Sequence, residues 1–234
     1  MRDYLKKGIE IIGAERIDEA KIDNLMKYLK LLTEYNAHTN LTAIRDEKEM
    51  LEKHFIDSLL LQNYIQKEDK NAMDIGTGAG FPGMVLAICN PHIKFTLMDS
   101  VGKKTKFLEY VKEQLNLENV EVINMRAEEF INDENRESYD LGLCRGVSQL
   151  PTILEYMIPF LKTQGRFLIQ KSPDTGEEAK ASNALEILNS TIEAEYNLNL
   201  PYCKDGRKVI IVRKIGITDK KYPRKTGIPL KRPL

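Results

Sequence analysis

Three closely spaced glycines, Gly76, Gly78 and Gly80, lie in a loop that could hold a small ligand against the protein backbone. Glycine has no Cβ, so such a loop can turn sharply and approach a ligand closely. The loop, residues 74–83, directly follows a short apolar run that is typical of a buried strand. Ligands of open α/β sheets bind at the carboxyl ends of the strands, so the pattern predicts a ligand site here.

Two acidic residues distinguish between the ligands that this loop could hold. Asp74 precedes the glycines, and Asp99 ends the next apolar run. A carboxylate at Asp99 can accept hydrogen bonds from both ribose hydroxyls of an adenosine group. A dinucleotide would bring its pyrophosphate near Asp74, whereas S-adenosylmethionine carries a cationic amino group and a sulfonium that this carboxylate would attract. The acids favour S-adenosylmethionine; a nicotinamide cofactor stays as the alternative, because Gly78–Gly83 formally matches GxGxxG.

A third segment, Arg126-Ala127-Glu128, follows the third apolar run. In a fold of this kind the turn borders the adenine ring, where Glu128 or the backbone of Ala127 could contact the adenine amino edge; a plain surface turn is the alternative. The segment 102–105, Gly-Lys-Lys-Thr, lacks the upstream glycine of a GxxxxGK[ST] motif. Nucleoside triphosphatase chemistry is therefore not indicated.

From residue 71 onwards, short apolar runs alternate with segments of helical periodicity, which predicts an α/β fold. The predicted strands are 72–75, 94–98, 120–124, 140–144 and 166–170, and the predicted helices are 83–89, 103–115, 150–161 and 177–189. Residues 192–198 and 209–214 enclose a turn at 204–206 and predict an antiparallel hairpin. We expect a Rossmann-like, mostly parallel sheet of seven strands, the fold of class I methyltransferases, with helices on both faces.

Two segments before this region, 17–36 and 46–65, have apolar residues three and four positions apart and predict helices, the first capped by Asp18. We therefore divide the chain into an N-terminal helical appendage, 1–69, and a methyltransferase domain with a basic C-terminal tail, 70–234.

The composition indicates a cytoplasmic protein without a metal site. No apolar run among the 234 residues approaches the ~20 needed to span a bilayer, and the N-terminus lacks the apolar stretch of a signal peptide. The three histidines have no metal-ligand spacing. Cys89, Cys144 and Cys203 form no CxxC pair, and we interpret all three as small buried hydrophobic residues.

The net charge is zero, with 35 basic and 35 acidic residues, which alone argues against nucleic-acid binding. The segment from Lys204 to the C-terminus, however, carries 11 basic residues and two acidic ones. A basic tail on an acidic body predicts contact with a polyanion, although a merely solvated tail has the same composition.

Several motifs that occur in order over residues 36–234 resemble those of one family. They are Asn40-Leu41-Thr42, His54-Phe55-Ile56-Asp57-Ser58-Leu59, the loop 74–83, Asp99-Ser100-Val101-Gly102-Lys103-Lys104, Arg126-Ala127-Glu128, Arg145, Gly165 with Lys171, Arg207, and the ending Lys221-Tyr222-Pro223-Arg224-Lys225 through Gly227, Pro229 and Pro233-Leu234. Together they resemble the bacterial 16S ribosomal RNA (guanine-N7) methyltransferase G family, also called glucose-inhibited division protein B. One departure is Gly146, where the family usually has alanine.

The resemblance implies that the chain transfers a methyl group from S-adenosylmethionine to N7 of a guanine in 16S ribosomal RNA. The partner would be this RNA or the small ribosomal subunit, and we expect a monomer. The cofactor positions carried over from the family are Gly76, Phe81, Ala127, Glu128 and Arg145; Asp74, Gly78 and Asp99 rest on the physical argument above.

The residues at the end of the fourth apolar run agree with this target. Exocyclic-amine methyltransferases need [DNS]PP[YFW] there, but the sequence has Cys144-Arg145-Gly146. The N7 lone pair of guanine carries no proton, so its methylation depends on alignment of the reacting atoms and needs no general base. We hypothesise that Arg145 donates hydrogen bonds to the guanine or to a phosphate. An ion pair with a loop carboxylate is the alternative.

The RNA phosphates are expected to contact Lys103, Lys171, Arg207 and the tail from Lys220, including Arg224. We interpret His54 and Asp57, one helical turn apart, as a structural pair that ties the appendage to the sheet; closure over the cofactor is the alternative. Three other functions stay open: methylation of another nucleobase or a small molecule, an NAD-dependent oxidoreductase, and a non-catalytic RNA-binding protein.

Overall fold

The computed structural model describes residues 1–14, 16–173 and 176–234 and contains a seven-stranded sheet in the order β3-β2-β1-β4-β5-β7-β6. The strands are β1 (Asn71–Ile75), β2 (Lys94–Met98), β3 (Val120–Ile123), β4 (Tyr139–Arg145), β5 (Leu161–Lys171), β6 (Ser190–Asn199) and β7 (Gly206–Lys214). The first five are parallel, and β7 runs antiparallel to both β5 and β6. This arrangement confirms the predicted mostly parallel sheet with a C-terminal hairpin.

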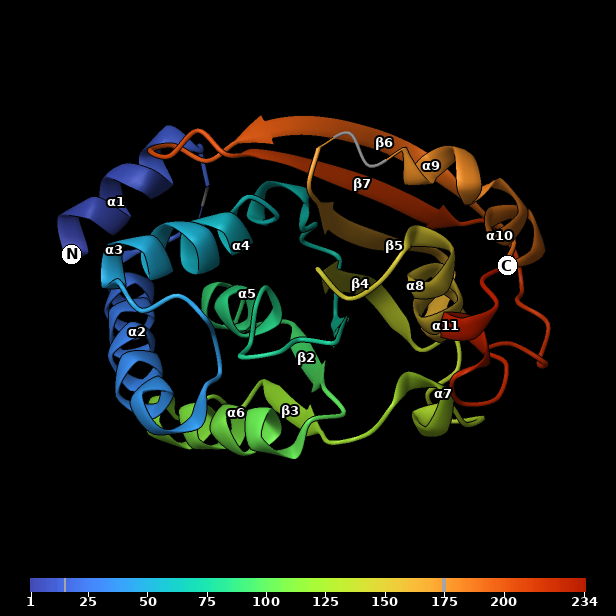
Figure 1. The fold of residues 1–234 in the computed structure, drawn as a ribbon, viewed down its shortest axis with the longest axis horizontal. Helices are drawn as coiled ribbons and strands as arrows, with labels where there is room; N and C mark the ends of the chain where they lie inside the picture. Colours follow the sequence, from blue (N-terminus) through green and yellow to red (C-terminus); the bar gives the residue numbers. More distant parts are fainter. Residues whose placement is uncertain (15, 174–175) are drawn as a thin grey trace.

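Helices cover both faces of the sheet (Figure 1). One face carries α2 (Glu19–Thr39), α5 (Gly83–Cys89) and α6 (Gly102–Leu115), and the other carries α8 (Leu150–Met157) and α10 (Ser182–Ile187). Successive strand residues point to opposite faces, so each buried strand contributes to two cores. In β1, Ala72 joins the core with α2, α5 and α6, whereas Met73 joins the core with α8 and α10.

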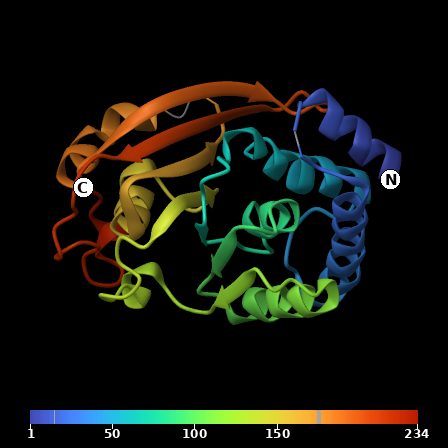
Figure 2. The same cartoon turned by 180° about the vertical axis from the view of Figure 1, so that it is seen from behind.

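The N-terminal helices pack against α5 and α6 and share one hydrophobic core with them. They are α1 (Arg2–Ile11), α2, α3 (Glu47–Met50), a π-helical segment (Leu51–Ile56), α4 (Asp57–Leu59) and a 3-10 turn (Gln62–Tyr64). Asp18 caps α2 as expected, because its Oδ1 accepts a hydrogen bond of 3.0 Å from the Lys21 amide. Figure 2 shows the same helices from behind, grouped at the N-terminal side of the molecule. The division at residues 69 and 70 stays a prediction.

Three predicted helices are less regular than the periodicity indicated. The segment predicted as one helix over 46–65 contains the π-helical stretch, and the helix predicted over 150–161 stops being α-helical after Met157, because Pro159 cannot donate the next hydrogen bond. The helix predicted over 177–189 is two helices, α9 (Glu177–Lys180) and α10, with Ala181 at the break and Ser182 and Asn183 directly after it. Serine and asparagine side chains compete for backbone hydrogen bonds and weaken a helix interior.

Short helices also form where the sequence indicated a turn or tail: α7 (Ala127–Phe130) and α11 (Ile228–Lys231).

Cys89 and Cys144 are buried, but the interpretation of Cys203 as buried is wrong: it is exposed because it lies in the tip of the β6–β7 hairpin. Among the described residues, no helix is long and apolar enough to cross a bilayer.

Candidate active site

The glycine loop after β1 is joined to the end of β2 by backbone hydrogen bonds. The amides of Gly76 and Thr77 donate to the carbonyl oxygen of Met98 at 2.8 and 3.0 Å. Gly76, Gly78 and Gly80 have φ angles of 70°, 64° and 99°, which glycine adopts without steric cost. The three glycines thus allow the chain to turn directly above the ends of two neighbouring strands.

Asp99, at the end of β2, orients this loop and lines a cavity of about 330 Å³. Its Oδ2 accepts a hydrogen bond from the Gly78 amide and its Oδ1 one from the Val101 amide, both at 2.9 Å. The Nζ atom of Lys104 lies 3.5 Å from Oδ2. A carboxylate can accept about four hydrogen bonds, so Asp99 keeps capacity for the hydroxyls of a ligand.

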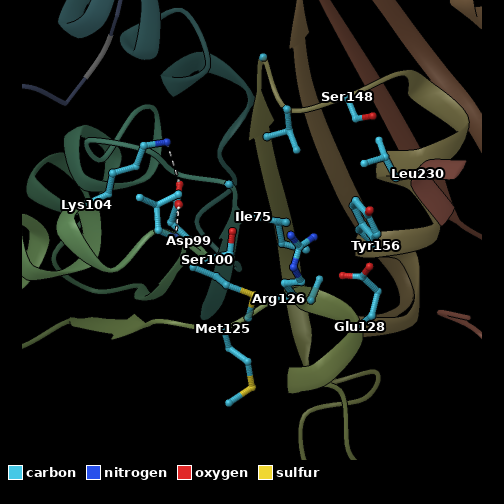
Figure 3. Close-up of a pocket in the computed structure, with 16 residues that line it drawn as sticks. Ile75, Asp99, Ser100, Lys104, Met125, Arg126, Glu128, Ser148, Tyr156 and Leu230 are labelled. Carbon is cyan, nitrogen blue, oxygen red and sulfur yellow. Dashed lines mark hydrogen bonds and ion pairs between the residues drawn. The ribbon is translucent and has the colours of Figure 1, made fainter. Parts of the chain in front are cut away.

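The opposite wall of this cavity carries polar groups from α7 and α8 (Figure 3). Glu128 Oε1 accepts a hydrogen bond of 3.0 Å from the amide of Gly227. Burial raises the pKa of Tyr156 to about 12, so its phenol stays protonated and can donate a hydrogen bond. Ile75 and Met125 contribute apolar surface between the two polar walls. A cavity with apolar surface between two walls of hydrogen-bonding groups suits an adenine ring.

Asp74 lies beneath the loop with 0% of its surface exposed, and its Oδ2 accepts a hydrogen bond of 2.8 Å from the Gly83 amide at the start of α5. Pyrophosphate groups bind such helix N-terminal amides, and here a buried carboxylate already uses the amide. Burial raises the pKa of Asp74 to about 6. The site therefore fits S-adenosylmethionine, which carries no phosphate, better than a dinucleotide.

The same position corrects our expectation that Asp74 faces the cofactor directly. Among the described residues, Asp74 does not line the cavity beside Asp99 or the neighbouring cavity at Phe81 and Arg145, because its carboxylate is turned under the loop toward Gly83. A Cβ atom built on Gly83 would lie 2.7 Å from Asp74 Oδ2, so the two residues are in close contact. Asp74 supports the loop from below.

A second cavity, of about 210 Å³, adjoins the first and shares Gly76, Lys104 and Gly146 with it. The residues that line only the second cavity are Leu41, Thr42, His54, Thr77, Gly78, Ala79, Phe81 and Arg145. The His54 ring stacks on Phe81 with centroids 4.6 Å apart and 17° between the planes. The guanidinium carbon of Arg145 lies 5.4 Å from the centroid of the Phe81 ring. The second cavity therefore has aromatic and cationic walls, which suit a nucleobase.

Arg145, at the end of β4, is held by the N-terminal helices. Its Nη1 donates to Asp57 Oδ2 at 3.1 Å and to the Lys53 carbonyl at 3.0 Å. Arg207 of β7 donates through Nε to Asp57 Oδ1 at 3.0 Å. Burial raises the pKa of Asp57, while the two guanidinium groups oppose this shift. The expected structural role is confirmed for Asp57, which joins the N-terminal helices to two strands.

His54 has a different position from the one expected, because it lines the second cavity. Burial, followed by the positive charge of Arg145, lowers the pKa of His54 to about 3, so the imidazole is neutral near pH 7. Its Nε2 lies 2.8 Å from Thr42 Oγ1, and its Nδ1 lies 3.4 Å from Arg145 Nη2. Since Arg145 can only donate, we assign the proton to Nε2.

The structure brings the predicted cofactor residues other than Asp74 to two adjoining cavities. The first is lined by Gly76, Asp99, Ala127 and Glu128, and the second by Gly76, Gly78, Phe81 and Arg145.

Three of the four predicted RNA-binding side chains are neutralised by carboxylates. Lys171 Nζ lies 2.8 Å from Glu177 Oε2 and also donates to the Ser148 carbonyl. Arg207 pairs with Asp57, and Arg224 pairs at 2.6 Å with Glu155, which has 0% exposure. Lys103 is exposed and donates to the carbonyl oxygens of Thr39 and Asn40 at 3.1 and 3.3 Å. Of these four, Lys103 is thus the best placed to meet a phosphate, and RNA contact stays a prediction for all of them.

Several lining residues were missed, including Val147, Tyr156 and Leu230. Val147 precedes α8 and Tyr156 lies within it. Their nearness to Arg145 in the sequence was the one signal that could have identified them as lining residues. Leu230 gave no such signal, because it is far from the loop in sequence. In residues 1–14, 16–173 and 176–234, no group of three or more His, Cys, Asp or Glu side chains could hold a metal ion.

Comparison with known proteins identifies relatives that span the whole chain. The family model described as rRNA small subunit methyltransferase G matches residues 21–210. The chain is 62% identical over 234 residues to the ribosomal RNA small subunit methyltransferase G of Fusobacterium nucleatum subsp. nucleatum, with 100% of both chains covered. It is 41% identical over 235 residues to the protein of the same name from Acetivibrio thermocellus, covering 100% of this chain and 97% of the relative.

Solved structures with lower identity show the fold alone. A SAM-dependent methyltransferase from Aquifex aeolicus matches with a TM-score of 0.54 and 18% identity, over 71% of this chain and 93% of that one. A Burkholderia thailandensis 1,6-didemethyltoxoflavin-N1-methyltransferase, solved with S-adenosylhomocysteine, matches with a TM-score of 0.57 and 16% identity, over 82% and 90% of the two chains. These matches agree with the class I methyltransferase fold expected from the sequence.

Proposed function

This chain belongs to the rRNA small subunit methyltransferase G family, and on that premise we propose that it transfers a methyl group from S-adenosylmethionine to N7 of a guanine in 16S ribosomal RNA. The observation that carries the proposal is the pair of adjoining cavities that meet at Gly76, Lys104 and Gly146. The first has the size and lining for an adenosine group, and the second has the aromatic and cationic walls of a nucleobase pocket.

The residues of the first cavity would hold the cofactor at both ends of its adenosine. Asp99 would accept hydrogen bonds from the ribose hydroxyls, and Glu128 with the Ala127 backbone would contact the adenine amino edge. A Cβ on Gly76 would lie 2.4 Å from Val147 Cγ2, so glycine at this position allows Val147 to pack beside the loop and line the cavity. When bound, the cofactor supplies an electrophilic methyl group.

The chain's own task at the second cavity is to orient the base. Phe81 and His54 form a stacked pair beside the cavity, and Arg145 can donate to O6 of guanine, which leaves the lone pair of the neighbouring N7 free to attack the methyl group. Because His54 is neutral, it can contact the base without adding a second positive charge beside Arg145. Alignment of this kind can contribute ~7–11 kcal/mol of a reaction barrier, and N7 methylation needs no proton removed.

The NAD-dependent oxidoreductase is the weaker alternative, because Asp74 takes up the Gly83 amide that a pyrophosphate would use. A direct comparison separates the two. S-adenosylhomocysteine should raise the melting temperature of the protein, and NAD at equal concentration should leave it unchanged.

The reaction itself is tested with purified protein, labelled S-adenosylmethionine and three acceptors: naked 16S RNA, small ribosomal subunits and a free nucleoside. We expect labelled 7-methylguanosine in nucleoside digests of the RNA or the subunit, and none from the free nucleoside. Asp99→Ala should abolish the label, whereas Glu34→Gln on the exposed face of α2 should retain it. Label in any other nucleoside would refute the proposed target.

An acceptor in the small ribosomal subunit implies a cytoplasmic location. We propose that the protein acts as a monomer, which light scattering of the purified protein would test.

A further inference from the structure

We propose that the C-terminal segment 222–232, here called the strap, completes the cofactor site, with Leu230 as a further residue that contacts the adenosine. This inference rests on the proposed function, because it names part of the wall of the same cofactor cavity. The family model ends at residue 210, so the strap lies beyond the matched region. Leu230 is nonetheless among the residues that line the first cavity, opposite Asp99 (Figure 3).

Exposed apolar side chains are concentrated around this cavity. Four large ones line it: Val101 with 39% of its surface exposed, Met125 with 40%, Val147 with 36% and Leu230 with 57%. They come from four different segments of the chain. Exposed apolar side chains that line one cavity mark a place that a ligand or partner covers. An adenosine between Asp99 and Glu128 would cover this surface, and Leu230 is its most exposed member.

The strap is anchored to α8 by an ion pair whose carboxylate is buried. Glu155, with 0% exposure, accepts hydrogen bonds from the Arg224 amide at 2.8 Å and from Arg224 Nη2 at 2.6 Å. Arg224 Nη2 also donates to the Arg232 carbonyl at 2.7 Å, which closes the strap on itself around Leu230. A third contact joins Thr152 Oγ1 to the Pro229 carbonyl at 3.2 Å. These bonds within the protein fix the position of Leu230.

The strap also positions the expected adenine acceptor. The amide of Gly227 donates to Glu128 Oε1 at 3.0 Å, and Thr226 Oγ1 lies 3.1 Å from Glu129 Oε1. One oxygen of Glu128 is therefore held by the strap, which fixes the position of this carboxylate in the wall of the cavity. Arg224 acts as a positioning residue, because it fixes the segment that carries Leu230 and Gly227.

The test measures S-adenosylhomocysteine affinity by calorimetry, without RNA, in the full-length protein. Leu230→Ala should weaken binding about tenfold, or ~1.4 kcal/mol, and Leu230→Asp should weaken it further. Ile217→Ala is the matched control, because Ile217 is 74% exposed in the same C-terminal region and lines neither cavity, and its affinity should be unchanged. In RNA assays, Leu230→Ala should raise KM for S-adenosylmethionine and leave kcat unchanged.

Arg224→Ala tests the anchor and should weaken S-adenosylhomocysteine binding, whereas Arg224→Lys should recover part of the loss. Far-UV circular dichroism of every ligand-free variant shows whether the protein is folded. The proposed role of the strap would be refuted, and the proposed function left intact, if three folded variants all bound S-adenosylhomocysteine with wild-type affinity. These variants are Leu230→Ala, Leu230→Asp and Arg224→Ala. A wild-type protein that binds no S-adenosylhomocysteine would overturn both. A wild-type protein that binds it but methylates no RNA would overturn only the proposed function.

Discussion

Replacement of Asp57 by asparagine should destabilise the protein strongly, because this carboxylate holds two guanidinium groups. Its side chain is 3% exposed, and those of Arg145 and Arg207 are each 18% exposed. Gln170 Nε2 donates to the same carboxylate at 2.5 Å. An asparagine in this place would keep the shape of the side chain and remove its charge, so that two largely buried cations would remain without a counterion.

The expected loss follows from this burial. Removing one partner of a fully buried ion pair costs ~3–5 kcal/mol. Because both arginines keep some contact with water, we expect about 2–4 kcal/mol for Asp57→Asn. Domains of this size are stable by only about 5–15 kcal/mol, so the variant should fold but lose much of its reserve.

Urea unfolding followed by circular dichroism measures the change. Glu34→Gln is the matched control, since Glu34 is 61% exposed and lies 3.9 Å from Lys30 Nζ; its loss should stay below ~0.5 kcal/mol. Arg207→Met should cost less in the Asp57→Asn background than in the wild type, because the unpaired cation is then removed. If Asp57→Asn lost less than ~1 kcal/mol of unfolding free energy and showed no coupling to Arg207, the stabilising role of the Asp57 carboxylate would be refuted.

Three other perturbations test neighbouring parts of the site. The folded pKa of His54 is about 3, below its usual 6.5, so the stability that its neutral form contributes is present above pH 6.5 and is lost as the pH falls toward 3. In urea unfolding at decreasing pH, His54→Gln should therefore lose less stability than the wild type. The difference is at most ~1.4 kcal/mol per pH unit, and solvent screening makes it smaller. Unfolding free energies that fall equally with pH in the two proteins would contradict this. Gly76→Ala should weaken S-adenosylhomocysteine binding at least about tenfold by calorimetry, because its Cβ would lie 2.4 Å from Val147. Gly13→Ala is the control and should bind normally, because Gly13 has a similar φ, +62° against +70°, and its Cβ would meet nothing within 4 Å. Lys103→Ala should lower the salt dependence of RNA binding by about one counterion in filter-binding assays, and an unchanged slope would remove Lys103 from the RNA contacts.

The central sheet could be predicted from the sequence because buried parallel strands and their covering helices leave strong periodic patterns. Segments 94–98 and 83–89 were predicted with the bounds that β2 and α5 have in the structure. The π-helical stretch at Leu51–Ile56 could not be predicted, because apolar residues three and four apart fit both helix types. This stretch carries His54 and places its ring against Phe81.

The site was harder to predict where a role depends on tertiary contacts. Asp99 was recognised from its place at a strand end. Asp74 has the same local signal, yet its carboxylate turns under the loop toward Gly83, and only the packed structure reveals this. The charges of Lys171 and Arg224 looked free in the sequence, because their carboxylate partners are identified only by the fold. Composition reports the charge of a segment but not which of its charges are already paired.

Methylation of a 16S guanine at N7 is tested most directly by mass spectrometry of 16S RNA from cells lacking this protein. One 7-methylguanosine should be missing, and it should return when the wild-type gene is supplied but not with Asp99→Ala. RNA with an unchanged content of 7-methylguanosine would contradict the account.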